Sequence, residues 1–353
     1  MTIVFLTRRF YPLIGGVETH SLEVAKRLSK HGYKIIIITE KIVHDFKNTY
    51  ITNAEEINGI EIKRIDVGSD DWLKKFRIWK ELWKLKSFIR QSDVVHCHDV
   101  FFWYLPFRFL YPSKKVYTTF HGYETKFPPE KKAILIRKIS EKLSKGNICV
   151  GEYIKKWYGS KPDFVVYGGV NKIRGLIHLT SSGQEIKNIN SKLKIALIGR
   201  LESDIGIGTY VKSLKLLRIK KFQFEFEAHG DGKLKEKLKK YGKVFGFATD
   251  ANKIFEKTDI IFASSYLILL EALIAKKIII ATYENKLKED YLKLSPFLKY
   301  IYICGSSEEC VKVIESIKNT PWKSEAMLSE GYNWASQQTW DKVADIYLRL
   351  WNA

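Results

Sequence analysis

Short apolar runs rich in β-branched residues alternate with helical patterns along the whole chain, and this alternation restricts the fold more than any other feature. Strands that alternate with helices predict parallel sheets covered by helices on both faces, an α/β fold. The strands are too many for one sheet. They are expected at Ile3–Leu6, Lys34–Thr39, Ile60–Ile65, Val94–His96, Lys115–Thr119, Asn147–Val150 and Phe164–Tyr167, and then at Leu193–Ile198, Phe222–Ala228, Lys243–Phe245, Ile260–Phe262, Ile278–Ala281 and Tyr300–Cys304.

The series of strands is interrupted at residues 171–192, where loop-forming residues predict a linker. A chain of 353 residues is also long enough for two domains. We therefore expect two Rossmann-like, doubly wound domains, residues 1–170 and 193–336, that face each other across a central cleft. The amphipathic pattern within residues 337–353 predicts a last helix, which we expect to return to the first domain.

Composition excludes several classes of protein. No run of about 18 apolar residues occurs, so no membrane-spanning helix is expected. The apolar run at the start of the chain is too short for a secretory signal and reads as a buried strand. The four cysteines are scattered without a CxxC pair. This spacing argues against a zinc site or a disulfide framework and fits a reducing cytosol.

The chain is strongly basic, with a formal net charge of +21. Residues 71–145 contain 17 Lys and Arg against 7 Asp and Glu, so the excess is concentrated there. Such a region attracts lipid headgroups, nucleic acid or phosphorylated substrates, unless the charge only reflects a basic proteome. No nucleic-acid recognition motif is present, and nucleic acid is therefore not an expected partner.

A strand followed by a helical pattern with one acid lies between residues 259 and 273. Asp259–Phe262 reads as a strand, and Glu271 comes about two turns into the helix that follows. A helix N-terminus exposes backbone N–H groups that suit a phosphate, and a carboxylate on the helix can accept hydrogen bonds from ribose hydroxyls. The pattern indicates a sugar-nucleotide site. The alternative is a plain βαβ unit whose Glu271 faces solvent.

Three further loops follow predicted strands. Gly15 and Gly16 specify a loop that can approach a diphosphate or an acceptor, although a tight turn is the simpler interpretation. His121, next to a glycine, is placed to touch a sugar hydroxyl or to cap its strand. Arg200 follows a glycine at the end of the first strand of the second domain, where a guanidinium can clamp a diphosphate.

The spacing of His96 and His98 could suggest a metal site. No other His or Cys cluster lies near them in the sequence, so we expect structural or substrate-orienting histidines and no bound metal.

The ordered set of motifs resembles family-4 retaining glycosyltransferases of the GT-B fold over nearly the whole chain. The motifs are Phe10-Tyr11-Pro12, Gly15-Gly16-Val17-Glu18, His121-Gly122, Gly199-Arg200-Leu201, Gly230-Asp231-Gly232 and Leu270-Glu271-Ala272. The resemblance implies a transferase with a nucleotide-sugar substrate, an acceptor-side first domain and a donor-nucleotide second domain. The acceptor would be a glycan or a lipid-linked glycan.

By resemblance, several residues of the second domain would bind the donor. Arg200 would grip the diphosphate and aid catalysis, and Glu271 would hold the ribose. The backbone near Tyr266 and Leu267 would meet phosphate or sugar, and the base would lie near Phe247.

The resemblance also implies roles in the first domain. His121 would contact the transferred sugar as a catalytic residue, and the loop of Gly15 and Gly16 would close over the reaction centre. The implied mechanism needs no metal or other cofactor. The acceptor hydroxyl would attack from the face that the diphosphate leaves, through an oxocarbenium-like transition state.

Two positions depart from the family pattern. Ala263 stands where the family usually has a second glutamate, and Ile205 stands where it often has a lysine. These departures leave open a non-catalytic relative that binds a nucleotide sugar or a glycan. A nucleotide-sugar epimerase, which shares the two-domain plan, is the other alternative.

Residues Trp72–Arg90 predict a basic amphipathic helix with two stripes. The aliphatic stripe contains Ile78, Leu82, Leu85 and Ile89, and the aromatic stripe contains Trp72, Phe76, Trp79 and Trp83, flanked by Arg77, Lys80 and Lys84. We expect the aliphatic stripe to pack on the first domain and the aromatic stripe to meet an anionic membrane or the acceptor. The alternative is that both stripes are core. This hypothesis predicts a cytoplasmic protein, peripheral on the inner face of the plasma membrane.

Overall fold

The computed structural model forms two compact units, which are described separately. Unit 1 consists of Met1–Gly168 together with Trp340–Ala353, and unit 2 consists of Gly169–Thr339. The described residues are 1–41, 54–122, 126–171, 192–203, 206–248, 250–320 and 324–352. Most of the predicted linker at residues 171–192 lies outside them.

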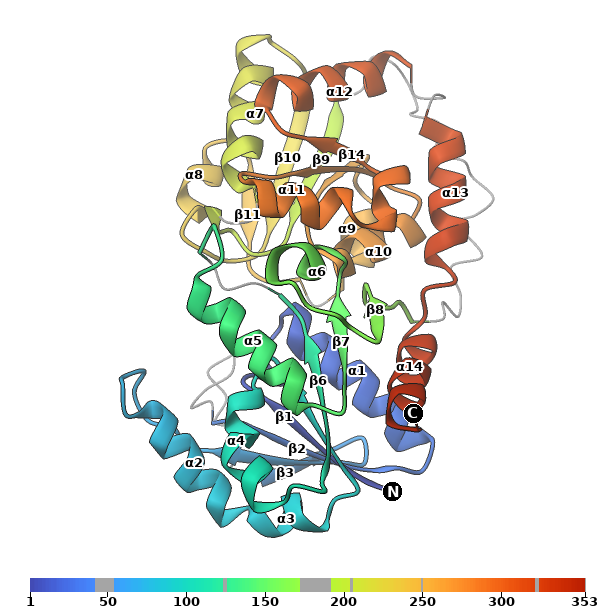
Figure 1. Cartoon of the computed structure of the whole chain (residues 1–353). Helices are drawn as coiled ribbons and strands as arrows, with labels where there is room; N and C mark the ends of the chain where they lie inside the picture. Colours follow the sequence, from blue (N-terminus) through green and yellow to red (C-terminus); the bar gives the residue numbers. More distant parts are fainter. Residues whose placement is uncertain are drawn as a thin grey trace. The chain divides into compact units, whose positions relative to one another are not determined.

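Unit 1 contains an eight-stranded sheet in the order β3-β4-β2-β1-β5-β6-β7-β8 (Figure 1). All of its described strand pairs are parallel except β3 with β4. The chain winds away from β1 in both directions, as expected for a doubly wound sheet. The strands are β1 (Thr2–Thr7), β2 (Lys34–Glu40), β3 (Ala54–Ile57), β4 (Ile60–Ile65), β5 (Val94–His98), β6 (Lys115–Phe120), β7 (Gly146–Val150) and β8 (Phe164–Val166).

Strand β3 was not expected from the sequence. It forms an antiparallel hairpin with β4 through Asn58 and Gly59, whose φ angles are 54° and 75°. Asn-Gly is the preferred pair for a two-residue hairpin turn because both central positions need a positive φ. The dipeptide was therefore the signal that could have predicted this strand.

The helices of unit 1 cover both faces of the sheet (Figure 1). The predicted helix at Trp72–Arg90 is divided into two helices, α2 and α3, at Leu85. The helices are α1 (Gly16–Lys30), α2 (Lys74–Lys84), α3 (Lys86–Gln91), α4 (Phe101–Leu110), α5 (Lys131–Leu143), α6 (Tyr153–Tyr158) and α14 (Trp340–Asn352).

Helix α14 lies beside α1 although more than 300 residues separate them in the sequence (Figure 1). Its buried face includes Val343, Tyr347, Leu350 and Trp351. The ring of Phe5, in the central strand β1, contacts both Tyr347 and Trp351. Helix α14 thus completes one face of the core of unit 1.

Unit 2 contains a six-stranded sheet in the order β11-β10-β9-β12-β13-β14, and all of its described pairs are parallel. Its strands are β9 (Leu193–Ile198), β10 (Phe224–His229), β11 (Lys243–Phe245), β12 (Ile260–Phe262), β13 (Ile278–Thr282) and β14 (Tyr302–Cys304). Its helices are α7 (Ile207–Ile219), α8 (Lys235–Lys239), α9 (Asn252–Phe255), α10 (Tyr266–Ile274), α11 (Lys286–Lys293), the 3₁₀ helix η3 (Pro296–Lys299), α12 (Ser307–Asn319) and α13 (Glu325–Ala335). The predicted α/β fold with two Rossmann-like sheets is confirmed.

Two composition-based expectations can be compared with the described residues. All four cysteines are buried and free, so none of them forms a disulfide. No described helix is long and apolar enough to cross a membrane.

Candidate functional site

In unit 2, the winding direction of the sheet changes between β9 and β12. In doubly wound sheets, ligands bind beyond the carboxyl ends of the strands at such a switch point. Strand β9 ends at Ile198, and Arg200 follows it; strand β12 ends at Phe262, and helix α10 begins four residues later. The fold therefore places Arg200 and the N-terminus of α10 at the same edge of one sheet.

The backbone around Arg200 is fixed by the neighbouring loop. Gly199 N–H donates to the carbonyl of His229 (3.0 Å), and Leu201 N–H donates to the carbonyl of Asp231 (2.8 Å). Gly230 has a φ of +154°, and a Cβ there would collide with the carbonyl oxygen of Gly199. The glycine turn predicted after β10 thus holds the loop that carries Arg200, whose side chain is exposed.

The N-terminus of α10 is shaped by two stacked tyrosines. The rings of Tyr266 and Tyr291 lie 4.0 Å apart at an angle of 6°. The Tyr266 N–H donates to the Tyr291 hydroxyl (3.1 Å), and the Tyr266 hydroxyl donates to the Tyr291 carbonyl (2.6 Å). Burial raises the pKa of Tyr291, and the nearby positive charge of Arg200 opposes that rise. Tyr291 was not predicted, because nothing in its sequence context marks it.

Leu267 follows Tyr266 in the first turn of α10, and its backbone N–H donates to no other described residue. Such N–H groups at a helix N-terminus attract anions. The N–H of Leu267 thus lies at the same edge of the unit 2 sheet as Arg200.

Glu271 lies on α10 with its side chain at the surface. The surrounding protein partly desolvates the carboxyl group and raises its pKa to about 7, and the negative charge of Asp250 adds to the rise. The carboxylate remains available as a hydrogen-bond acceptor above neutral pH.

Three further positions singled out in the sequence belong to unit 2. Phe247 is half-buried just after β11, and the neighbouring Phe245 is exposed and stacks on His229 with ring centroids 4.8 Å apart. Ala263 is buried at the end of β12, and Ile205 lies outside the described residues.

In unit 1, the loop after β1 leads through Gly15 and Gly16 into α1. Gly15 is the N-cap of the helix, and the carboxylate of Glu18 lies where a Cβ on Gly15 would be. Nothing lies within 4 Å of the Cβ position of Gly16. Arg64, from β4, donates to the carbonyl of Tyr11 (2.7 Å) and anchors the start of this loop.

His121 follows β6 at the carboxyl edge of the unit 1 sheet, next to His98 at the end of β5. His98 Nδ1 lies 2.9 Å from His121 Nε2, and the two rings are stacked with centroids 5.1 Å apart. The ring of His20, from α1, meets the His121 ring edge to face at 4.8 Å. The backbone N–H of His121 donates to Asp99 Oδ1 (3.0 Å). The structure thus gathers three histidines here, and sequence analysis had not singled out His20.

A chain of buried hydrogen bonds runs from α14 to His20. Trp351 Nε1–H donates to His96 Nδ1 (3.1 Å), so His96 carries its proton on Nε2 and donates it to Thr119 Oγ1 (2.7 Å). Tyr347 links Thr119 Oγ1 (2.9 Å) to His20 Nε2 (3.0 Å) through its hydroxyl. His96 therefore has a structural role, which is one of the two roles, structural or substrate-orienting, expected for these histidines.

We expect Tyr347→Phe to lower the free energy of unfolding by about 1–3 kcal/mol, because it leaves buried groups on His20 and Thr119 without this partner. Urea unfolding followed by fluorescence measures the change. Tyr332→Phe is a matched control, since the Tyr332 hydroxyl bonds to no other described residue. Equal unfolding midpoints for the two variants would contradict the expectation.

Although histidines gather in unit 1, no group of three or more His, Cys, Asp or Glu side chains among the described residues is arranged to hold a metal ion.

Helix α2 and the turn before it present an exposed aromatic surface, called the α2 surface, which we define as Trp72, Phe76 and Trp83. These side chains are 79%, 57% and 50% exposed, respectively. Trp79 differs from the prediction: it is half-buried, and its indole N–H donates to the carbonyl of Phe102 (2.9 Å). Its place on the α4 side of the helix removes it from the exposed surface. The predicted aliphatic stripe packs in the core of unit 1.

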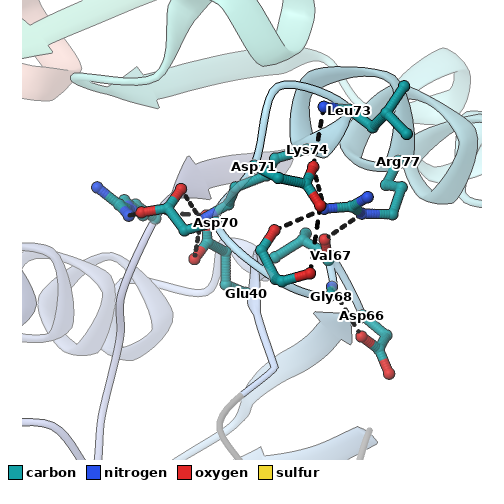
Figure 2. A network of polar contacts seen from close by, with 11 residues as sticks. Glu40, Asp66, Val67, Gly68, Asp70, Asp71, Leu73, Lys74 and Arg77 are labelled. Carbon is teal, nitrogen blue, oxygen red and sulfur yellow. Dashed lines mark hydrogen bonds and ion pairs between the residues drawn. The ribbon is translucent and has the colours of Figure 1, made fainter.

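The turn that leads into α2 is held by a polar network (Figure 2). Arg77 turns back and donates to the carbonyl of Val67 (2.7 Å) and to Asp71 Oδ1 (2.8 Å). Lys74 pairs with Glu40 at 3.1 Å. These two basic side chains are engaged inside unit 1 and are not free to meet a partner.

Other lysines near α2 remain exposed. Lys75 and Lys80 form no ion pair with a described residue, whereas Lys84 pairs with Glu81 at 2.5 Å. Lys86 Nζ lies 4.6 Å from the ring centroid of Trp83. The aromatic surface is thus bordered by cations.

Comparison with models of protein families matches residues 14–172 to Glycosyltransferase Family 4. The matched range contains the loop of Gly15 and Gly16 and also His121. A search of curated protein sequences finds no match.

Solved structures resemble the chain over nearly its whole length. Sucrose-phosphate synthase from Thermosynechococcus elongatus has a TM-score of 0.76 at 13% identity, covering 99% of this chain and 98% of that chain. A glycosyltransferase from Rickettsia africae has a TM-score of 0.69 at 18% identity, covering 99% and 97%. Anabaena HepE in complex with UDP has a TM-score of 0.72 at 13% identity, covering 99% and 98%. At these identities the similarity shows the fold.

The fold is therefore that of a GT-B glycosyltransferase. Residues 14–172 match the family-4 model, which confirms, over that part of the chain, the resemblance predicted from the motifs. The family match, which lies almost entirely in unit 1, supports a glycosyltransferase.

Proposed function

We propose that this glycosyltransferase moves a sugar, with retention of configuration, from a nucleotide-sugar donor to a glycan or lipid-linked acceptor at the cytoplasmic face of a membrane. One observation carries the donor part of the proposal. At the switch point of the unit 2 sheet, the exposed Arg200 and the N-terminus of α10 lie at the same edge of the sheet, and Glu271 lies on α10.

The chemistry of these groups fits a nucleoside diphosphate. The guanidinium of Arg200 can accept the negative charge that grows as the diphosphate leaves, and the N–H of Leu267 can donate to a phosphate oxygen. Glu271 can accept hydrogen bonds from ribose hydroxyls, and Phe247 follows the strand that would border the base. HepE, which has the same fold, was solved with UDP, so UDP-sugars are the first donors to test.

In unit 1, His121 would contact the transferred sugar, and the loop of Gly15 and Gly16 would approach it. The bond from the anomeric carbon to the diphosphate oxygen breaks, and the acceptor oxygen bonds to that carbon on the same face. The acceptor proton passes to the departing diphosphate oxygen. The proposal uses no metal or other cofactor, because a guanidinium and backbone N–H groups supply the charge stabilisation.

The membrane part of the proposal rests on the α2 surface. Aromatic side chains favour the boundary between water and lipid, and each nearby Lys or Arg contributes about 1 kcal/mol at an anionic surface. The exposed Trp72, Phe76 and Trp83 are bordered by Lys75 and Lys80. This combination supports an anionic membrane as the proposed partner, and a lipid-linked acceptor is the substrate class that fits such a surface.

A panel of sugar nucleotides tests the transferase proposal. The protein is incubated with each donor, with and without membrane extract, and release of nucleoside diphosphate is measured. Transfer to an acceptor, with an NMR spectrum showing the donor's anomeric configuration in the product, is the expected result. Binding without release would favour the non-catalytic alternative suggested by Ala263 and Ile205. Release without a glycosylated acceptor would favour the epimerase.

Glu271→Ala is expected to raise the donor KM about 10-fold, since it removes hydrogen bonds to ribose. In the parent enzyme, the donor KM should also rise as the pH falls below about 7, because the raised pKa lets the carboxyl group take up a proton there. Initial rates at several donor concentrations and pH values measure both effects. Glu330→Gln, an exposed acid on α13, is the control. An unchanged KM in Glu271→Ala would remove Glu271 from the donor site.

A further inference from the structure

The hydrogen bond between His98 and His121 restricts which ring nitrogen of each histidine carries the proton. His98 Nδ1 and His121 Nε2 are 2.9 Å apart, so one of these nitrogens donates and the other accepts. Burial lowers the pKa of both rings well below the ordinary value, and the charge of Arg137 lowers that of His121 further. His20 also lowers the pKa of both rings, and His96 lowers that of His121. Both rings are therefore neutral at physiological pH, and each carries one N–H.

The other nitrogen of His98 decides the direction of the bond. His98 Nε2 is buried and has no hydrogen-bond partner among the described residues. If His98 Nδ1 accepted, Nε2 would carry the proton and would be a buried N–H without an acceptor. Orphaned buried N–H donors are rarer than under-satisfied acceptors, and leaving one costs the full desolvation of the group. The favoured arrangement has the proton on His98 Nδ1.

The consequence falls on His121. When His98 Nδ1–H donates, His121 Nε2 accepts and the single proton of His121 lies on Nδ1. His121 is half-exposed, and its Nδ1 forms no hydrogen bond to another described residue. Among the described residues nothing accepts a hydrogen bond from this Nδ1–H, so the ring can offer it to a ligand.

We propose that His98 is a positioning residue that fixes His121 as the Nδ1–H tautomer, so that His121 donates a hydrogen bond to a hydroxyl oxygen of the transferred sugar. This inference rests on the proposed function, because it takes the sugar as the ligand of His121. His98 itself is only 1% exposed and acts through His121 without touching the substrate. The opposite tautomer would present an acceptor and would select a different hydrogen-bond pattern on the sugar.

The tautomer is measured directly in full-length protein labelled with ¹⁵N-histidine. Long-range ¹H–¹⁵N spectra distinguish protonated from unprotonated ring nitrogens, and His121→Asn assigns the signals. The expected result is a proton on Nδ1 of both His98 and His121. A proton on Nε2 of His121 would overturn the proposal, whether or not the enzyme is active.

Two substitutions then test the effect on function. His98→Asn keeps a donor close to the position of Nδ1, whereas His98→Phe keeps a ring and removes the donor. We expect His98→Phe to give mixed His121 tautomers and to lower kcat about 10-fold, with the donor KM nearly unchanged. His98→Asn should restore most of kcat and the single tautomer. A purely structural role would instead alter unfolding midpoints in both variants without this pattern.

The outcomes separate this inference from the proposed function. If the parent enzyme transfers no sugar, the proposed function fails while the tautomer measurement stands. If it transfers sugar and His98→Phe retains both its kcat and the His121 spectrum, the positioning role is wrong. Should His98→Phe fail to fold, the spectrum of the parent protein still decides the proton position.

Discussion

Replacement of Arg200 by alanine is expected to lower kcat about 100-fold to 1,000-fold, the range seen when one preorganised group that stabilises transition-state charge is removed. Arg200 is exposed on a backbone held by its neighbours, so its loss should change the chemistry without unfolding unit 2. Release of nucleoside diphosphate, measured with saturating donor and acceptor, gives kcat. Arg200→Lys should be intermediate, since a lysine keeps the charge and loses the fork of N–H groups.

Arg218→Ala is the matched control for this experiment. Arg218 is also an exposed guanidinium of unit 2, but it packs over the ring of Tyr241 at 4.9 Å, at the C-terminal end of α7. Its removal should leave kcat within about two-fold of the parent value, as is usual for surface positions away from a site. Equal activity of Arg200→Ala and Arg218→Ala would refute the role of Arg200 as the charge-stabilising group.

Serine at all three positions of the α2 surface should weaken binding to anionic vesicles about 100-fold. Trp72, Phe76 and Trp83 are each exposed, and loss of each aromatic contact with lipid removes ~1 kcal/mol. Co-sedimentation with vesicles containing phosphatidylserine measures the affinity. Binding of the parent protein should also fall as salt is added, because the bordering lysines contribute a screened attraction.

The control for the vesicle experiment replaces exposed apolar side chains elsewhere. Ile219 and Leu298, in unit 2, are 65% and 49% exposed, and the variant with serine at both should bind as the parent does. Trp79 is left unchanged in both proteins, because its indole N–H bond to Phe102 supports the packing of α2. If the triple variant binds vesicles like the control, the membrane role of α2 is wrong.

Much of the fold could be predicted because the sheets are built from local signals. Apolar β-branched runs such as Ile3–Leu6 and Ile278–Ala281 read as buried strands, and the structure has strands there. The antiparallel β3 was missed because Glu55 and Glu56 interrupt its apolar pattern, although the Asn-Gly turn beside it was visible. The hydrophobic periodicity also predicted one helix where the structure has α2 and α3, because this pattern does not reveal the break at Leu85.

The site was predictable only where a residue follows a strand. Arg200 and His121 come directly after strands, so the order of elements places them at a ligand-binding edge. Tyr291 and Tyr347 reach their partners from other parts of the chain, through contacts that no local pattern encodes. Trp79 shared its stripe with exposed aromatic residues, and only the packing of α2 on α4 shows that it is turned inward.

The return of α14 to unit 1 has a consequence for synthesis of the protein. During translation, the ribosome makes all of unit 2 before it reaches Trp340. Until then, Phe5 and His96 lack the tyrosine and tryptophan that cover them in the finished fold. The first unit to be translated is thus the last to be completed, and the nascent chain must keep this uncovered surface from aggregation throughout the intervening time.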